Sequence, residues 1–153
     1  GDPKRVVLMG HSAGAHLISL INSDPAFAKD AGAGAWLAAV SLDSGAYDVE
    51  AIMKRRHMSL FDKAFGKDKT FWRAASPIRR IGGKPAPMLL VCSSRGRDSC
   101  GQAQAFKAAL DKEKAAATVA PEDLSHREIN LNLGQANPYT KRVDAFLQAQ
   151  GLP

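Results

Sequence analysis

The chain has 153 residues, of which 45% are apolar and 24% are charged, and its formal net charge is +6. This composition is that of a globular protein, and no apolar run approaches the ~20 residues that a membrane-spanning helix requires. The basic residues gather in small clusters at 54–56, 79–80 and 95–97 without interleaved aromatic residues, so we expect no nucleic-acid partner.

The first predicted elements are a buried strand and a buried helix. Residues 6–9 form a continuous apolar run that ends at Gly10, and such runs are typical of strands that are covered on both faces in a parallel sheet. Residues 13–22 follow as a helix that is apolar on nearly every side, which predicts a central position. We expect a connection of small residues over 26–35 and a second buried strand over 36–42.

The rest of the chain is predicted to alternate between helices and strands. In chain order we expect helices over 49–57, 59–65 and 70–76, a strand over 87–92, a helix over 101–114, a strand over 118–120, and helices over 126–133 and 138–150. The alternation predicts an α/β fold, in which a parallel sheet with flanking helices makes a single, partial domain over 1–153. The segment 46–77 is either a cap over a functional site or only a helical connection between strands.

One motif carries chemistry. Residues 10–14, Gly-His-Ser-Ala-Gly, match the G-x-S-x-G pattern that puts a serine on a sharp turn between a strand and a helix. Glycines flank the serine because side chains would clash there, and the turn lifts the Ser12 hydroxyl clear of the surface. The pattern lies between a predicted strand and a predicted helix, as its function requires. The alternative is a glycine-rich turn with an incidental serine.

A serine needs a base to become a nucleophile, and the chain has four histidines. His11 and His16 flank Ser12, and we expect His11 to point away from the serine hydroxyl. His57 follows a basic run on a surface helix. His126 lies after the last predicted strand, and it alone is late enough for the order serine, acid, histidine. We therefore expect His126 to be the general base; otherwise it is a loop or helix-capping histidine.

Two aspartates compete to orient this histidine. Asp98 follows the third predicted strand, and Asp43 lies at the tip of the second; both are at carboxyl ends of strands, where parallel sheets place functional groups. We favour Asp98 and keep Asp43 as the alternative, although Asp98 could instead cap the next helix. Asp48 is expected to be a plain N-cap, and Asp123 is too close to the histidine in sequence. The acid fixes the imidazole tautomer without taking the proton.

The two cysteines, Cys92 and Cys100, are too few for a disulfide scaffold or a zinc site. Their spacing allows a local disulfide, and two free thiols are the alternative. We expect no metal. The compartment stays open, with a lean towards a secreted or periplasmic protein.

The segment 6–17 resembles the nucleophile segment of carboxylesterases of the α/β-hydrolase superfamily, and it is closest to the branch of lipase/esterase and kynurenine formamidase-like enzymes. The segments 44–48 and 75–77 resemble the same branch, and the loops around Asp98 and His126 follow its plan. The resemblance implies a serine carboxylesterase that cleaves short-chain or aryl esters through an acyl-enzyme, with a formamide as the alternative substrate and no cofactor.

The chain departs from this family at its start. Such enzymes have several strands and an oxyanion loop of the His-Gly-Gly type before the nucleophile strand, which begins here at residue 5 or 6. The chain therefore resembles the C-terminal half of the fold, with the Ala13 N–H as the one evident oxyanion donor. A catalytically impaired or binding domain is the alternative function. The strand 6–9 would form an exposed sheet edge, which predicts self-association.

Overall fold

The computed structural model describes residues 1–96 and 98–152, so Arg97 of the third basic cluster and Pro153 lie outside the described residues. Four parallel strands form one sheet in the order β1-β2-β3-β4. Their bounds are Val7–His11, Ala38–Leu42, Met88–Ser93 and Ala117–Glu122. The predicted parallel α/β sheet is confirmed.

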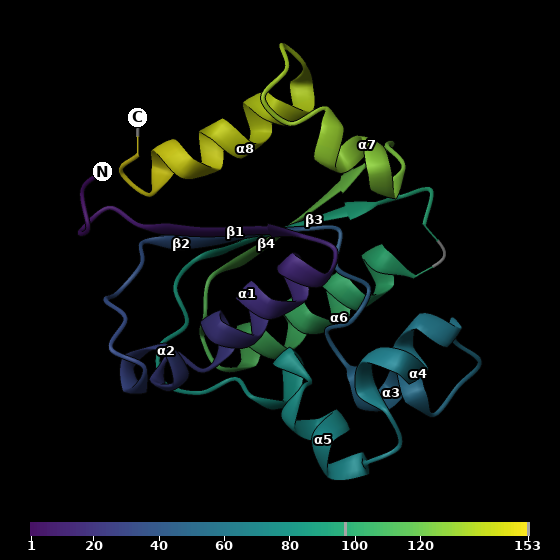
Figure 1. Ribbon diagram of the computed structural model, residues 1–153. Helices are drawn as coiled ribbons and strands as arrows, with labels where there is room; N and C mark the ends of the chain where they lie inside the picture. The colour runs from purple at the N-terminus through teal and green to yellow at the C-terminus, as the bar shows by residue number, and fades with distance from the viewer. Residues whose placement is uncertain (97, 153) are drawn as a thin grey trace.

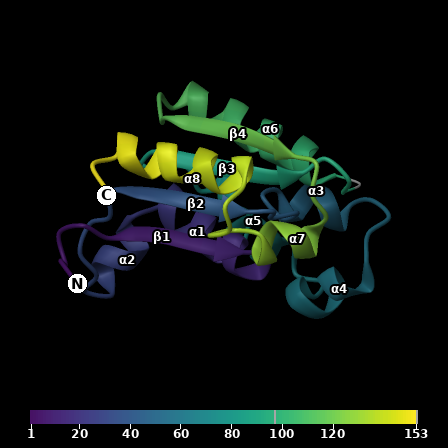
Figure 2. The ribbon, with the colours of Figure 1, turned by 90° about the horizontal axis from the view of Figure 1, so that it is seen from above.

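Helices cover both faces of this sheet (Figure 1). The helices are α1 (Ala13–Ser23), α2 (Ala26–Asp30), α3 (Val49–Met53), α4 (Ser59–Phe65), α5 (Lys69–Ala74), α6 (Ser99–Lys112), α7 (His126–Leu131) and α8 (Pro138–Ala149), with a 3₁₀ turn, η1, at Pro77–Arg79. Helices α7 and α8 lie on one face, and α1 and α6 lie on the other. Figure 2 shows α8 lying over β2 and β3 and running roughly along the strands.

The two inner strands are buried along their whole length, which explains why their sequences are apolar runs rather than alternating patterns. Towards α7 and α8, the core is built of Val40, Leu42, Leu89, Val91, Ala120, Ile129, Tyr139 and Val143. Towards α1 and α6, it is built of Ala39, Tyr47, Met88, Leu90, Cys92, Ala103, Phe106, Leu110 and Ala115. Burial on both faces fixes the register of the strands, and the register decides which residues meet at their carboxyl ends.

Strand β1 is less well covered. Its Leu8 and Val7 pack against the two cores, whereas Val6 and Met9 remain 39% and 41% exposed. Within the described sheet β1 pairs with β2 alone, so the predicted edge is present. None of the described helices combines the length and apolarity needed to cross a bilayer.

Several element boundaries differ from the expectation. Helix α2 occupies part of the segment expected to be a connection, where the guanidinium of Arg80 lies 4.1 Å from the centre of the Phe27 ring. Helix α3 ends at Met53 rather than at residue 57, because the Arg55 N–H donates to the Ile52 carbonyl three residues back and tightens the chain. Helix α6 begins two residues earlier than expected, at Ser99.

Helices α3, α4 and α5 share a small core of their own. Its buried members are Ala46, Val49, Ile52, Trp72 and Ala75, with Met53, Phe61 and Phe65 packed against them. A buried contact joins this cluster to α1, because the Nδ1–H of His16 donates to the Ala46 carbonyl (2.8 Å).

Candidate active site

The carboxyl ends of β1 and β2 lie side by side. His11 pairs with Leu42 in the parallel register, so Ser12 and Asp43 are the next residues on neighbouring strands. The Ser12 N–H donates to the Leu42 carbonyl (3.0 Å). Both Ser12 (φ 56°) and Asp43 (φ 55°) have positive φ, which non-glycine residues seldom adopt and which is concentrated at functional sites.

The turn from β1 into α1 requires a glycine at position 10. A Cβ atom there would lie 2.5 Å from the backbone carbon and oxygen of Gly14, so any other residue would push the strand and the helix apart. Gly14 itself has open space around it. Helix α1 begins at Ala13, directly after the serine, and the N–H of a first helical residue has no acceptor within its helix. This N–H is therefore available to an anion beside Ser12.

His126 is the first residue of α7, and a capping box fixes where this helix starts. The Ser125 hydroxyl accepts the Glu128 N–H (3.3 Å), and the Glu128 carboxylate accepts the Ser125 N–H (2.7 Å). Those hydrogen bonds hold the pKa of the Glu128 carboxyl below its usual range. Arg95, in the loop after β3, binds both Asp123 (2.7 Å) and Glu128 (3.2 Å) and so ties that loop to the segment that carries the histidine.

The His126 imidazole binds the Asp43 carboxylate. The Nδ1 of His126 lies 2.6 Å from Asp43 Oδ2, and because a carboxylate only accepts hydrogen bonds, Nδ1 carries the proton. The Nε2 atom of the neutral ring is then an acceptor, as a general base requires. Asp43 is only 4% exposed, whereas the His126 side chain is 54% exposed. A buried carboxylate thus orients a ring that solvent or a substrate can reach.

The structure brings Asp43 rather than Asp98 to the histidine. Asp98 precedes α6, where its carboxylate makes an exposed ion pair with Arg55 and a weak contact with Gln102 (3.4 Å). It does not cap the helix through its side chain. Asp48 caps α3 as expected, since it accepts the Ala51 N–H (3.0 Å).

His11 is a contact that the sequence did not indicate. Its ring contacts that of His126 at a tilt of 37°, with 4.4 Å between the centroids, and its Nε2–H donates to the His126 carbonyl (2.9 Å). The position of His11 within the motif does not predict this contact, because His126 lies 115 residues further along the chain.

No hydrogen bond between described side chains involves the Ser12 hydroxyl. Ser12 lies beside Asp43 across the sheet and directly after His11, and both of these residues contact His126. Of the other histidines, His16 is buried and hydrogen-bonded to the Ala46 carbonyl. His57 contacts the Asp62 carboxylate through its Nε2 atom (3.0 Å). In residues 1–96 and 98–152, no group of three or more His, Cys, Asp or Glu could hold a metal ion.

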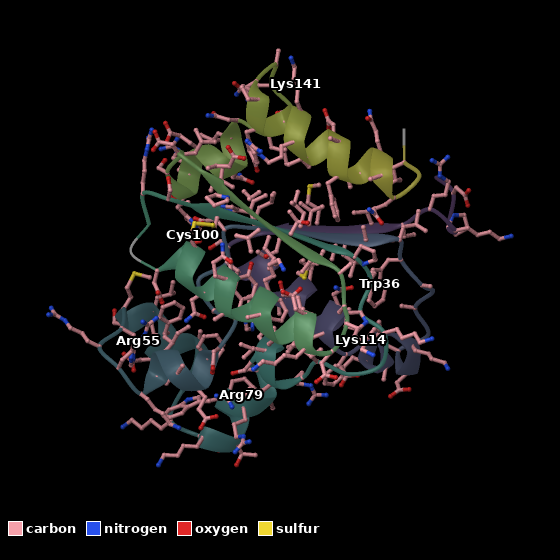
Figure 3. The ribbon with its side chains drawn as sticks, turned by 180° about the vertical axis from the view of Figure 1, so that it is seen from behind. Trp36, Arg55, Arg79, Cys100, Lys114 and Lys141 are labelled. Atoms are coloured by element: carbon pink, nitrogen blue, oxygen red, sulfur yellow. A yellow bond between two sulfur atoms is a disulfide. The ribbon has the colours of Figure 1, made fainter. Side chains whose placement is uncertain are left out.

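The open question about the cysteines is answered by the structure, because Cys92 and Cys100 form a disulfide. It joins the carboxyl end of β3 to the first turn of α6. Figure 3 shows Cys100 and its disulfide at the end of the molecule opposite Trp36 and Lys114, which belong to the amino-terminal side of the sheet.

This arrangement of sheet, helices and strand tips is that of part of an α/β-hydrolase fold. No protein-family model matches the sequence, and no curated protein matches it. Among solved structures, the chain is similar to esterase B from Lactobacillus rhamnosis, with a TM-score of 0.70, 18% identity, 98% of this chain and 53% of that chain covered. A thermophilic esterase from Thermogutta terrifontis gives a TM-score of 0.66 at 19% identity, covering 92% of this chain and 53% of that chain.

A third similar structure, EstE5, has a TM-score of 0.69 and 18% identity, covering 97% of this chain and 54% of that chain. The chain spans about half the length of each of these structures. At this level of identity the likeness establishes the fold. The predicted resemblance to one part of an α/β-hydrolase esterase is thereby confirmed for the architecture.

Proposed function

We propose that the chain is a serine carboxylesterase-type hydrolase that cleaves short-chain or aryl esters through an acyl-enzyme. Ser12 is the nucleophile, His126 the general base and Asp43 the acid that orients it, in place of Asp98. The observation that carries this proposal is the bond from His126 Nδ1 to the buried Asp43 carboxylate (2.6 Å), at the residue next to Ser12 across the sheet.

The chemistry follows from the tautomer of the histidine. Nε2 of His126 accepts the proton of the Ser12 hydroxyl as the oxygen attacks the ester carbonyl carbon, and the Ala13 N–H binds the oxyanion that forms. The imidazolium then gives its proton to the leaving alcohol, which departs and leaves an acylated serine. A water molecule repeats the sequence and releases the acid. Throughout, Asp43 stabilises the imidazolium and keeps its proton on Nδ1.

The similar structures support an ester as the substrate. The crystal of EstE5 was soaked by p-nitrophenyl butyrate, and esterase 2 of T. terrifontis has been obtained phosphoramylated by tabun. Both reagents suit a test of this chain, because the first is a short-chain aryl ester and the second belongs to the organophosphorus compounds that modify activated serines.

The test compares hydrolysis of p-nitrophenyl butyrate by the unaltered chain and by Ser12→Ala. Removal of the nucleophile is expected to reduce the rate to that of the serine-free background, whereas Ser94→Ala, a matched loss of one exposed hydroxyl at another strand end, leaves it unchanged. Labelling by a fluorophosphonate probe is expected to follow the same pattern. Equal turnover by Ser12→Ala and by the unaltered chain would show that the serine is not the nucleophile.

A catalytically impaired domain is the second candidate, and one observation favours it. In the described part of the chain the Ala13 N–H is the one evident oxyanion donor, and loss of one such donor typically costs ~10²–10³ in rate. Labelling of Ser12 without measurable turnover would indicate this second function. Absence of both labelling and turnover would support neither function, and only the fold would remain established.

We further propose that the segment 46–77 lies over the site as a cap, and that the free edge of β1 promotes self-association. The separate core of α3, α4 and α5 supports the first proposal. Exposed Val6 and Met9 support the second. Size-exclusion chromatography over a range of concentrations tests the association; a concentration-independent monomer would exclude it.

A further inference from the structure

The Asp43 carboxylate is held from both ends of a single loop. Its Oδ1 accepts the backbone N–H of Ser93 (2.7 Å) and the hydroxyl of Ser99, while Oδ2 is left for His126. Ser93 ends β3 and Ser99 begins α6. Cys92 directly precedes the first donor and Cys100 directly follows the second, and a disulfide joins them.

We propose that Ser99 is a positioning residue for the acid–base pair and that the Cys92–Cys100 disulfide keeps its hydroxyl on Asp43. This inference deepens the proposed function and rests on it for its kinetic consequences. Neither Ser99 nor the cysteines touch the reacting atoms; they act by fixing the plane of the carboxylate, and so the direction in which Oδ2 meets the imidazole.

Two donors on one oxygen have a specific effect. A carboxylate that is bound at Oδ1 by the Ser93 N–H alone can still rotate about its Cβ–Cγ bond and carry Oδ2 away from His126. The Ser99 hydroxyl reaches the same oxygen from another direction and opposes this rotation. Hydrogen bonds to an ionised, buried acceptor are among the stronger ones in proteins, and Asp43 is 4% exposed.

The start of α6 needs the disulfide because its N-cap does not hold it. Asp98 makes no side-chain capping hydrogen bond; its carboxylate is turned towards Arg55 instead. The first turn of the helix, which carries Ser99, therefore lacks the contact that usually fixes a helix start. The covalent link from Cys100 to the buried Cys92 of β3 supplies the missing anchor.

The first experiment removes the hydroxyl. Ser99→Ala is expected to lower kcat for p-nitrophenyl butyrate about tenfold with an unchanged KM. Ser99→Thr keeps a hydroxyl and is expected to restore most of the rate. Ser94→Ala is the matched control, because the Ser94 hydroxyl belongs to the same loop but donates to the Glu122 carbonyl (3.1 Å) and not to Asp43.

The second experiment opens the disulfide. Dithiothreitol breaks the S–S bond by giving each sulfur one electron and one proton, and it becomes a cyclic disulfide itself. The reduced chain is expected to lose kcat in the same direction as Ser99→Ala. Cys100→Ala is expected to start from this lowered rate and to show no further response to the reductant, which separates the effect on this bond from any other effect of the reagent.

A readout that does not depend on turnover keeps the positioning role separate from the proposed function. The ¹⁵N shifts of the His126 ring distinguish the Nδ1–H tautomer from the Nε2–H tautomer. We expect the unaltered chain, Ser94→Ala and Ser99→Thr to hold the proton on Nδ1, and Ser99→Ala and the reduced chain to move part of it to Nε2.

The outcomes are distinguishable. If Ser12→Ala leaves hydrolysis intact, the proposed function fails while the tautomer measurement still tests the role of Ser99. If Ser99→Ala and Ser94→Ala have the same kcat and the same His126 ring shifts, with far-ultraviolet circular dichroism showing both folded, Ser99 does not position the acid. A reduced chain with the kcat and ring shifts of the oxidised chain would remove the disulfide from the proposal.

Discussion

The ends of β2 and β3 present two aspartates that look alike in sequence and differ in structure. Asp43 is buried at the tip of β2 and is bound by Ser93, Ser99 and His126. Asp98 follows β3, its side chain is 41% exposed, and it forms an ion pair with Arg55. The first carboxylate belongs to a fixed network, whereas the second belongs to the surface.

Strand register, more than sequence order, decides which acid contacts the histidine. Both aspartates stand between the serine and the histidine in the chain, so the order serine, acid, histidine admits either. Only Asp43 is the neighbour of Ser12 across the sheet, because His11 pairs with Leu42. Exposure then decides how much each contact contributes to stability. An exposed ion pair contributes at most about 1 kcal/mol, whereas a buried carboxylate that loses its partners is strongly destabilising.

Converting each acid into its amide separates the roles of the two aspartates. Asp43→Asn keeps the shape of the side chain but presents an N–H to His126, which forces the proton onto the wrong ring nitrogen. A decrease in kcat of about 10³–10⁴-fold is expected, the size seen when the acid of a serine triad is replaced in this way. Steady-state hydrolysis of p-nitrophenyl butyrate measures it.

Asp98→Asn is the matched control for that change. It removes one exposed charge from the pair with Arg55, so kcat should stay within about twofold and the free energy of unfolding within about 1 kcal/mol. If instead Asp98→Asn were the more damaging variant, the assignment of the acid would return to the loop after β3.

His11 is the other residue expected to hold His126 in place. His11→Ala removes both the ring in contact with His126 and the donor to its carbonyl, and kcat is expected to fall about tenfold because one hydrogen bond and one aromatic contact are lost. His11→Gln can keep the donor and should recover part of the rate. His57→Ala, which alters a histidine outside this network, is the control; equal rates for the two alanine variants would show that His11 has no such role.

Much of the fold is predictable from the sequence, because buried strands require continuous runs of apolar residues. The apolar runs at 6–9, 36–42 and 87–92 predict strands covered on both faces, and each strand is present within two residues. Boundaries fail where a local contact decides them. Helix α2 forms in a segment whose small residues indicate only a connection, and α3 closes early on the Ile52 carbonyl.

The candidate site is predictable in part. The serine, its strained turn and the late histidine follow from a motif and from chain order, which also predict that either Asp43 or Asp98 is the acid. The contact from His126 to Asp43, the ring contact of His11 and the two donors at the ends of the loop after β3 do not follow from the sequence. They arise where four strand ends converge, and one sequence without the register contains no information about which ends are neighbours.

Two histidines in different surroundings are predicted to respond to pH in opposite ways, and this is the smallest of the three predicted effects. Burial against α3–α5 lowers the pKa of the His16 imidazole, and its hydrogen bond to the Ala46 carbonyl offsets this only partly. The hydrogen bond to the carboxylate of Asp62, whose side chain is 63% exposed, raises the pKa of the partly buried His57. Only the protonation of His16 should change the free energy of unfolding measurably, because the pair of His57 with an exposed carboxylate contributes little.

The sign follows from proton binding. As the pH falls below the ordinary histidine value of 6.5, the unfolded chain takes up a proton at position 16 before the folded chain does, so the free energy of unfolding decreases. His16→Asn can keep a donor for the Ala46 carbonyl without a titrating ring, and its free energy of unfolding, measured by urea titration, should fall less between pH 7 and pH 5. His57→Asn removes a group whose stabilisation is present at low pH and lost as the pH rises, so it cannot lessen the fall. A steeper decrease for His16→Asn than for the unaltered chain would mean that this ring does not link the helical segment to α1 in its neutral form.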